Sequence, residues 1–261
     1  MMLDKIIETK KEEVARLKKE ASAVRLMETG TGRRPGRDFL EALSGRATAI
    51  IAEVKCASAS RGRLVEKFDP LALAKTYEEN GAAAISVLTD ETYFQGCKDY
   101  LTQIKDIVGV PVLRKDFIID PLQLYETKAI GADAVLLIVR VLGLRLSEFL
   151  ALAARQGLTA LVEVHTRGEL DLALAAGAAV IGINNRNLDT FATDINTSVD
   201  LKKHVPPGRV VVAESAIKER SDIEHLKKAG IGAFLIGEGL VTAPDPGAKL
   251  RSFLGATIDA G

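Results

Sequence analysis

Short apolar runs alternate with segments of helical periodicity along most of the chain after residue 46. The runs are nearly continuous in β-branched and aliphatic residues, which is typical of strands buried on both faces of a parallel sheet. Eight runs show this pattern, at 47–55, 82–90, 111–117, 134–140, 159–165, 180–186, 210–215 and 233–239.

Helices are predicted between these runs, because apolar residues recur there with a period near 3.6. Clear examples are 70–80, 121–130, 146–156, 167–176 and 218–229.

Glycines mark the junctions where a predicted helix ends and the next strand begins. Gly81, Gly131, Gly177 and Gly230 each occupy such a junction, where glycine stops a helix by adopting the left-handed conformation. Eight strand–helix units predict a single closed (β/α)8 barrel, the TIM-barrel fold. A doubly wound open sheet is the alternative. It usually carries a GxGxxG fingerprint after its first strand, and the segment after Val54 has none.

The first 45 residues are predicted to be a helical extension of the barrel. Residues 2–20 form an amphipathic pattern, with the lysines and glutamates, Lys10 among them, expected on the solvated face. A loop rich in Gly, Arg and Pro follows at 29–38, and then a short helix over 38–43 with Asp38 as N-cap. We expect one domain over 1–261. It comprises an extension over 1–45 that covers the catalytic mouth and a barrel over 46–261.

Composition and charge exclude several classes of protein. Of 261 residues, 47% are hydrophobic and 27% charged, which excludes a disordered or collagenous chain. The formal net charge is +0, so we expect no nucleic-acid partner. There is neither an apolar run of about 18–20 residues nor an apolar signal core, so we expect no membrane association and a cytoplasmic location. Cys56 and Cys97 lack metal-ligand spacing and are expected to be reduced thiols.

Polar residues gather late in the predicted strands and share one parity within each strand. In a (β/α)8 barrel these positions point into the mouth, where active sites lie. The residues are Glu53, Lys55, Lys115, Glu163, Asn184, Arg186, Glu214, Ser215 and Gly237. A single buried Glu–Lys pair could be structural, but this many converging charges indicate an enzyme that uses acid–base chemistry. Each carboxylate has a cationic neighbour, so we expect no metal and no cofactor.

The three histidines give a weaker signal. His165 follows Glu163 on the same parity, and a positioning role and a purely structural role are both open. His204 and His225 fall in segments expected to be solvated helices.

Two loops of small residues are candidates for binding an anion. They begin Glu214-Ser215-Ala216 and Gly237-Glu238-Gly239, at the place where such barrels often bind phosphate. A simple turn is the alternative for each. The loop at 56–64 is small, polar and basic, and could be either an exposed flexible loop or one that closes over substrate.

The chain resembles the indole-3-glycerol phosphate synthase family over nearly its whole length. The resembling motifs, in order, are IAEVKCASASRG (51–62), ISVLTDETYFQGC (85–97), PVLRKDFIID (111–120), LVEVHT (161–166), IGINNRNLDTF (181–191), VAESAI (212–217) and FLIGEGL (234–240). The resemblance implies a cofactor-independent lyase of tryptophan biosynthesis. Its substrate would be the small phosphorylated molecule 1-(2-carboxyphenylamino)-1-deoxyribulose 5-phosphate, and its products indole-3-glycerol phosphate, CO2 and water.

The resemblance also implies roles for individual residues. Lys115 matches the general acid of ring closure and Glu163 the acid of dehydration. Lys55 matches a lysine that binds a substrate anion or removes a proton during dehydration. The remaining matched positions orient or bind substrate: Glu53, Asn184, Ser58, Arg186 (facing the anthranilate carboxylate), Phe94, Phe117 and Leu188 (an apolar slot), and Glu214, Ser215, Ala216, Gly237 and Glu238 (the phosphate side).

Three positions depart from the pattern of the family. Ala59 replaces a proline in A-S-P-S, Ala216 replaces the glycine of E-S-G-I, and Gly239 stands where a serine is frequent. If the backbone at Ala216 needs a positive φ, alanine costs on the order of 1 kcal/mol there.

Other functions remain open at the level of sequence. Phosphoribosylanthranilate isomerase chemistry normally uses a cysteine–aspartate pair, and Cys56 has no evident partner. A Schiff-base aldolase using Lys115 or Lys55 and a degenerate barrel kept as a binding scaffold are further alternatives. We expect a monomer, with a homodimer or an association with other tryptophan-pathway enzymes as alternatives.

Overall fold

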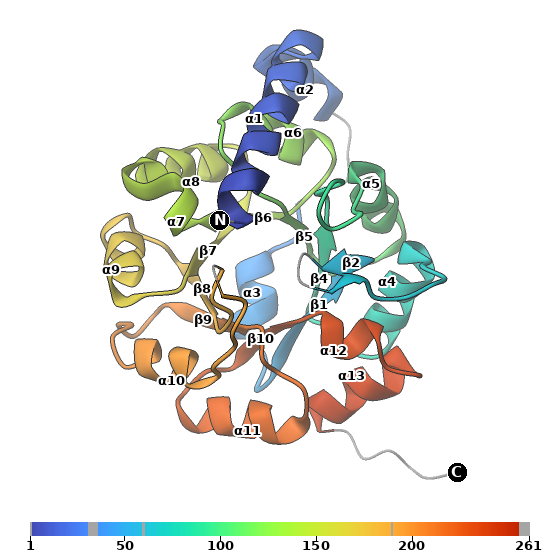
Figure 1. Ribbon diagram of the computed structural model, residues 1–261, viewed down its shortest axis with the longest axis vertical. Helices are drawn as coiled ribbons and strands as arrows, with labels where there is room; N and C mark the ends of the chain where they lie inside the picture. Colours follow the sequence, from blue (N-terminus) through green and yellow to red (C-terminus); the bar gives the residue numbers. More distant parts are fainter. Residues whose placement is uncertain (1, 31–35, 59–60, 189, 256–261) are drawn as a thin grey trace.

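Eight parallel strands close into a barrel in the computed structural model, which describes residues 2–30, 36–58, 61–188 and 190–255 (Figure 1). The order around the barrel is β1-β10-β9-β8-β7-β6-β5-β4, so the prediction of a (β/α)8 barrel is confirmed and the open sheet is excluded. The strands are β1 (Ala49–Val54), β4 (Ala84–Leu88), β5 (Val112–Lys115), β6 (Ala134–Ile138), β7 (Thr159–Val164), β8 (Val180–Asn184), β9 (Val210–Glu214) and β10 (Ala233–Ile236).

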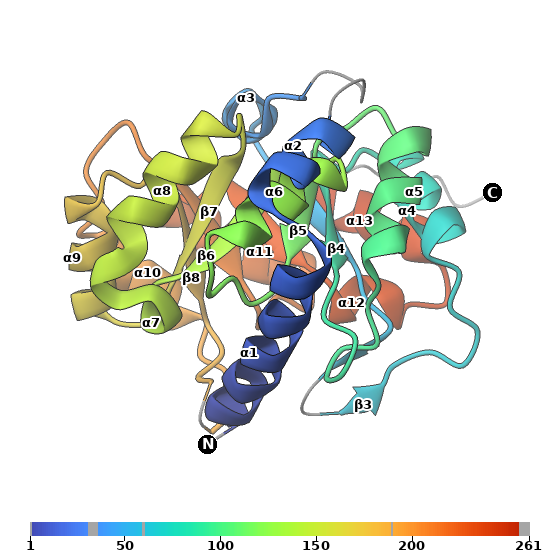
Figure 2. The ribbon, with the colours of Figure 1, turned by 90° about the horizontal axis from the view of Figure 1, so that it is seen from above.

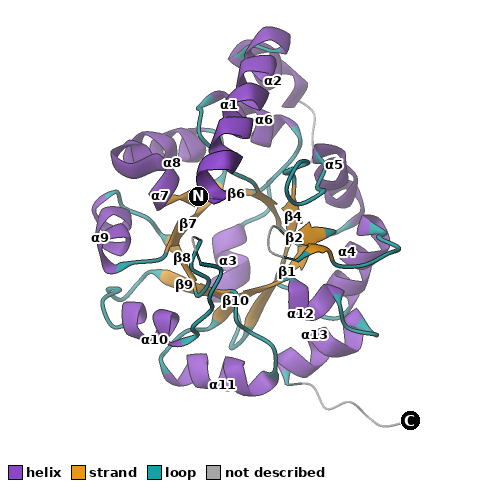
Figure 3. Cartoon of the chain, in the orientation of Figure 1, coloured by secondary structure: helices purple, strands orange, loops and turns teal. Residues whose placement is uncertain are grey.

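Most helices surround the barrel on its outside, and one lies across the end of the ring of strands (Figure 3). They are α1 (Met2–Glu20), α2 (Ala23–Gly30), α3 (Phe39–Ser44), α4 (Pro70–Glu79), α5 (Lys98–Ile107), α6 (Leu122–Ala129), α7 (Val139–Leu142), η1 (Gly143–Arg145), α8 (Leu146–Arg155), α9 (Arg167–Ala175), α10 (Asn196–Lys202), α11 (Arg220–Lys228), α12 (Glu238–Val241) and α13 (Pro246–Leu254). The predicted helices agree with these bounds to within one or two residues. Four junction glycines, Gly81, Gly131, Gly177 and Gly230, have positive φ, as predicted. His204 is exposed, as expected, but lies in the turn after α10 rather than in a helix.

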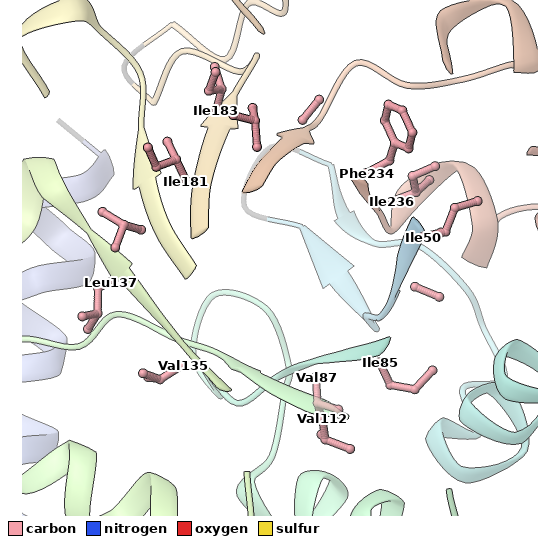
Figure 4. Packing of buried hydrophobic residues seen from close by; sticks show 14 of the residues in the cluster. Ile50, Ile85, Val87, Val112, Val135, Leu137, Ile181, Ile183, Phe234 and Ile236 are labelled. Atoms are coloured by element: carbon pink, nitrogen blue, oxygen red, sulfur yellow. The ribbon is translucent and has the colours of Figure 1, made fainter. Parts of the chain in front are cut away.

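Alternation along the strands separates two hydrophobic cores. One set of side chains packs outward against the helices, including Ile50, Val87 and Ile181 (Figure 4). The other set fills the inside of the barrel and includes Ile51 and Leu161. In several strands, the alternate residues that point into the barrel become polar toward the carboxyl end, and these polar residues line the mouth.

The N-terminal segment contacts both ends of the barrel. Asp38 caps α3 by accepting a 2.9 Å hydrogen bond from the backbone N–H of Glu41, as predicted. Phe39 and Leu43 of α3 are buried in the inner core and close the amino-terminal end of the barrel. Figure 2 shows α3 and the N-terminus at opposite ends of the barrel, with α1 running along the side of the mouth. The expectation that the extension covers the mouth therefore fits α1 and not α3. The domain boundary at residues 45 and 46 stays a prediction.

Lys10 corrects one expectation about α1. The lysines of this helix were expected on its solvated face, but Lys10 is 1% exposed. Its Nζ lies 2.9 Å from Asp90 Oδ2 and 2.9 Å from Asp116 Oδ1, in the loops that follow β4 and β5. Burial lowers the pKa of Lys10, but the two aspartates raise it by more, so the ammonium stays charged. Burial raises the pKa of Asp116, while Arg114 and Lys10 lower it, with a net fall to about 2.

Replacing Lys10 by methionine should destabilise the protein by about 3 kcal/mol or more. The change preserves the bulk of the side chain but leaves two buried carboxylates without this partner, which is costlier than losing an exposed ion pair. Urea denaturation measures the free energy of unfolding of each variant. The matched control is Lys11→Met, because Lys11 is 60% exposed and pairs with Glu8 on the surface. That control should change stability by at most about 0.5 kcal/mol. Equal effects of the two variants would contradict the structural role of Lys10.

Candidate active site

A cavity of about 830 Å³ opens at the carboxyl ends of the strands, within the size range of small-molecule sites. All of the residues predicted for the site line this cavity, so the structure brings together what was scattered over the sequence. They are Glu53, Lys55, Ser58, Phe94, Lys115, Phe117, Glu163, Asn184, Arg186, Leu188, Glu214, Ser215, Ala216, Gly237 and Glu238. Their location is thus established, while their chemical roles stay predictions.

Lys115 lies between two buried carboxylates. Its Nζ is 3.6 Å from Glu163 Oε2 and 3.6 Å from Glu214 Oε2. Burial lowers the pKa of Lys115, but the carboxylates of Glu163, Glu214 and Glu53 raise it by more. Lys115 is therefore an ammonium ion at neutral pH, in the protonation state that a general acid needs.

Glu214, by contrast, is a carboxyl group whose surroundings favour its neutral form. Burial raises the pKa of its carboxyl, and although Lys115 lowers it, repulsion by Glu163 and Glu53 adds to the rise, to about 8. Neither carboxyl oxygen has a hydrogen-bond partner among the residues that the structure describes. A carboxyl group in this setting is neutral near pH 7, which reduces the negative charge around Lys115.

Glu53 and Lys55 form a second pair on the inward parity of β1 and the residue after it. Lys55 Nζ lies 2.7 Å from Glu53 Oε1, and only the lysine is appreciably exposed. Burial raises the pKa of Glu53, but Lys55 and Lys115 lower it by more, so this carboxylate is ionised. The site thus carries two lysines and carboxyl groups of contrasting proton affinity, a combination typical of acid–base catalysis.

Two glycines make room for the carboxylates inside the barrel. A Cβ atom at Gly182 of β8 would overlap Glu214 Oε1, and one at Gly237 would overlap Glu53 Oε1 and lie 3.0 Å from Lys55 Nζ. Gly237 was predicted as part of the phosphate side, whereas Gly182 was missed. An isolated glycine within a strand signals close approach of another group, and that signal was present at Gly182.

Replacing Gly237 by alanine should disable the Glu53–Lys55 pair. The added methyl group would occupy the position of the Glu53 carboxylate and force both side chains to move. We expect kcat/KM to fall at least about tenfold and stability to fall by about 1–3 kcal/mol, the usual cost of overpacking. Steady-state kinetics and urea unfolding measure the two effects. Gly168→Ala is the control, since outside its own turn of α9 no atom of the described residues lies within 4 Å of a Cβ there. Unchanged kinetics for Gly237→Ala would contradict the proposed packing.

Aromatic and aliphatic side chains form an apolar wall of the cavity. The rings of Phe94 and Phe117 have centroids 6.1 Å apart, and Leu188 also lines the cavity. Helix α1 adds Leu3 and Ile6, which sequence analysis did not assign to the site. Their helical spacing indicated a buried face, but nothing in the sequence indicated that this face meets the mouth.

The loop after β9 has the strained backbone that the Ala216 departure suggested. Ser215 and Ala216 both have positive φ, at 64° and 63°. Alanine at that position costs on the order of 1 kcal/mol relative to glycine. The Nδ2 of Asn185 donates a 3.2 Å hydrogen bond to the Ser215 carbonyl and supports this conformation. Gly239 lines the same cavity, and Ala59 lies outside the described residues.

The loop after β1 contains an antiparallel hairpin instead of irregular chain alone. Its strands are β2 (Ala57–Ser58) and β3 (Gly62–Arg63). Ser58 Oγ accepts a 3.2 Å hydrogen bond from the backbone N–H of Arg61, and the Arg61 side chain pairs with Glu238 across the cavity. Glu238 also lies 3.9 Å from Arg186. Thus the hairpin is connected to the predicted phosphate side.

The described residues form neither a metal centre nor a membrane-spanning helix. Within the described ranges, no group of three or more His, Cys, Asp or Glu residues could hold a metal ion. Among the helices of residues 2–30, 36–58, 61–188 and 190–255, none is long and apolar enough to cross a membrane.

A closed parallel barrel with buried acids and bases at its mouth defines an enzyme of the (β/α)8-barrel class. The sequence profile of indole-3-glycerol phosphate synthase matches residues 3–253 of the chain. The chain belongs to the indole-3-glycerol phosphate synthase family, whose members are carboxy-lyases of tryptophan biosynthesis.

Individual relatives agree with this assignment. Indole-3-glycerol phosphate synthase of Chlorobium chlorochromatii is 50% identical over 242 residues, which cover 91% of this chain and 94% of the relative. The enzyme of Chlorobaculum tepidum is 50% identical over 254 residues, with 96% and 98% covered. Among solved structures, 3-hexulose-6-phosphate synthase superposes with a TM-score of 0.64 at 16% identity, covering 80% of this chain and 99% of that one. This second kind of likeness shows the fold alone.

Proposed function

We propose that the cavity converts 1-(2-carboxyphenylamino)-1-deoxyribulose 5-phosphate into indole-3-glycerol phosphate, CO2 and water, with Lys115 and Glu163 as successive acids. The observation that supports this most strongly is that a charged lysine, 16% exposed, lies 3.6 Å from both Glu163 and Glu214 on the wall of one small-molecule cavity. Two adjacent acids suit a reaction that must protonate two different oxygen atoms in succession.

Ring closure is the first step. The aromatic carbon that bears the carboxylate attacks the ketone carbon, and the electron pair of the C=O bond moves to oxygen. The Lys115 ammonium donates a proton to that oxygen as the charge develops, which general acid catalysis makes faster by about 10²–10⁴-fold. The surrounding carboxylates keep the lysine protonated until the substrate takes the proton.

Decarboxylation and dehydration complete the reaction. Loss of CO2 returns its bonding electrons to the ring and restores aromaticity. Glu163 then protonates the departing hydroxyl group, which leaves as water, and a base removes a proton from the neighbouring carbon. Lys55, with its Nζ 2.7 Å from Glu53 Oε1, is placed either to bind a substrate anion as an ammonium ion or, as a neutral amine, to accept that proton.

The remaining residues bind and orient the substrate. In this proposal Phe94, Phe117 and Leu188 contact the aromatic ring, and Arg186 faces the anthranilate carboxylate. The side chain of Asn184 accepts a 3.0 Å hydrogen bond from the backbone N–H of Arg186 and so helps to fix the backbone that carries Arg186. The phosphate group is assigned to the loops after β9 and β10, with hairpin residue Ser58 across from them. These loops contribute Glu214, Ser215, Ala216, Gly237 and Glu238 to the wall.

An assay for indole fluorescence on the purified protein tests the proposed function. Incubation with the carboxyphenylamino substrate should give a fluorescent indole product and an equal amount of CO2. Borohydride trapping with substrate separates the Schiff-base alternative, because only an aldolase would become covalently labelled. Absence of product from correctly folded protein would exclude the proposal.

We further propose that the enzyme acts in the cytoplasm as a monomer. The balanced charge of the chain supports this assignment. Light scattering at working concentration distinguishes a monomer from a homodimer, and co-purification tests an association with other tryptophan-pathway enzymes.

A further inference from the structure

His165 lies directly after β7 with a carboxylate on each side. Its Nε2 is 3.4 Å from Glu163 Oε1, and its Nδ1 is 3.2 Å from Glu169 Oε2. The side chain is 9% exposed, so it is nearly enclosed while still touching the surface. The two imidazole nitrogens therefore connect the candidate dehydration acid with a second carboxylate behind it.

Glu169 fixes the orientation of this imidazole. It belongs to the first turn of α9, where its backbone N–H donates to the Thr166 hydroxyl at 3.3 Å. Its Oε2 accepts a 2.6 Å hydrogen bond from the His165 backbone N–H. Because that oxygen also accepts from Nδ1–H, the other nitrogen, Nε2, is directed at Glu163. Nε2 has no hydrogen-bond partner among the described residues that would compete with Glu163.

The charges around His165 favour its protonated form. Glu163 faces it from β7, Glu169 from α9, and the cationic Arg140 from α7. Burial and Arg140 lower the pKa of His165, but the Glu169 hydrogen bond and the Glu163 charge raise it by more. The imidazole thus holds a proton at higher pH than an exposed histidine does.

Glu163 has a nitrogen donor on each side of its carboxyl group. Lys115 Nζ lies 3.6 Å from Oε2, and His165 Nε2 lies 3.4 Å from Oε1. Dehydration requires a proton on Glu163. By that step Lys115 has already given its proton to the ketone oxygen, and His165 is placed on the opposite side to supply another.

We propose that His165 stores the proton that Glu163 delivers to the departing hydroxyl group, an inference that rests on the proposed function. The Nε2–H bond breaks and an O–H bond forms at Glu163 Oε1. Glu163 passes a proton to the hydroxyl group, which leaves as water, and His165 regains a proton from solvent. The base passes on the proton lost from the substrate carbon and Lys115 regains one, so a turnover takes up one proton in total, which matches the negative charge of the carboxylate that leaves as neutral CO2. His165 is a positioning residue that acts through Glu163 and needs no contact with substrate.

The test compares two products of one turnover in the variant His165→Asn. Asparagine retains polar atoms but cannot carry the proton. With enzyme in excess over substrate, CO2 release should stay within about twofold of the unaltered protein, because ring closure depends on Lys115. Indole formation should slow at least about tenfold, so a decarboxylated, still hydroxylated intermediate accumulates. Added imidazole should restore indole formation. The control is His204→Asn at an exposed position, which should leave both rates unchanged.

Several results would overturn the proposal. Equal slowing of CO2 release and indole formation would indicate a purely structural role, and no change in either would exclude any role. If His165→Asn does not fold, nitrogen NMR of the histidines in the unaltered protein decides. The spectra should show a protonated His165 at neutral pH. In the Glu163→Gln variant, His165 should lose its proton at a lower pH than it does in the unaltered protein. A neutral imidazole would contradict the proposal. If the unaltered protein releases neither CO2 nor indole, the proposed function itself fails.

Discussion

Replacing Lys115 by alanine should lower kcat by about 10²–10⁴-fold while the barrel stays folded. Lys115 is the only group placed between Glu163 and Glu214 in the described cavity that is positively charged at neutral pH. Without it, the oxygen that becomes negative in ring closure would face carboxyl groups instead of a cation. Both CO2 release and indole formation should disappear, because the lost step precedes both. Indole fluorescence measures activity, and circular dichroism with thermal unfolding verifies the fold.

The control for this variant is Lys203→Ala. Lys203 forms an exposed pair with Asp200 far from the cavity, and its loss should leave kcat unchanged. Near-normal activity of Lys115→Ala would show that the acid of ring closure is misassigned. A variant that does not fold would call for Lys115→Met, which keeps the aliphatic bulk inside the barrel.

Replacing Glu163 by glutamine should lower kcat for indole formation by about 10²-fold or more, with KM changed by less than about threefold. Glutamine has nearly the same shape, so binding persists, but its amide cannot give up a proton to the departing hydroxyl group. CO2 release in a single turnover should remain, which separates this variant from Lys115→Ala. The measurement is the ratio of CO2 to indole over time.

Glu148→Gln is the matched control, since Glu148 is exposed and pairs with Arg145 on the outside of the barrel. It should leave kcat and KM unchanged. A Glu163→Gln enzyme that showed only a higher KM would have lost a binding contact and not an acid.

The strands could be predicted because both of their faces are buried. A continuous apolar run such as Ala134–Ile138 can be identified as a strand from its own residues, without knowledge of the strands that pair with it. The hairpin formed by β2 and β3 was not predicted, because strands of two residues carry no periodicity. Helix α5 was not among the helices named, since its polar and apolar residues follow a loop without a capping side chain at Cys97.

The site was predictable to the extent that strand parity and strand ends determine it. These two rules bring Glu53, Lys115 and Glu163 to one cavity without knowledge of any distance. Lys10 shows where such reasoning ends. It shares the helical spacing of the buried residues Leu3, Ile6 and Val14, but because it is charged it was expected on the solvated face. Its partners Asp90 and Asp116 lie far along the chain, and only tertiary structure reveals them.

The glycines at 182 and 237 imply that charge and shape in this barrel cannot change independently. Each carboxylate occupies the volume that a neighbouring strand gives up by having no side chain. If one of these glycines were replaced by a larger residue, the facing glutamate would have to be replaced by a shorter side chain. If the glutamate were lost first, a cavity would remain beside the glycine, and a methyl group there would restore packing. The free-energy changes caused by substituting a glycine and its facing glutamate should therefore be non-additive. A change to a different set of acidic groups in this barrel would require both members of a pair to be replaced together.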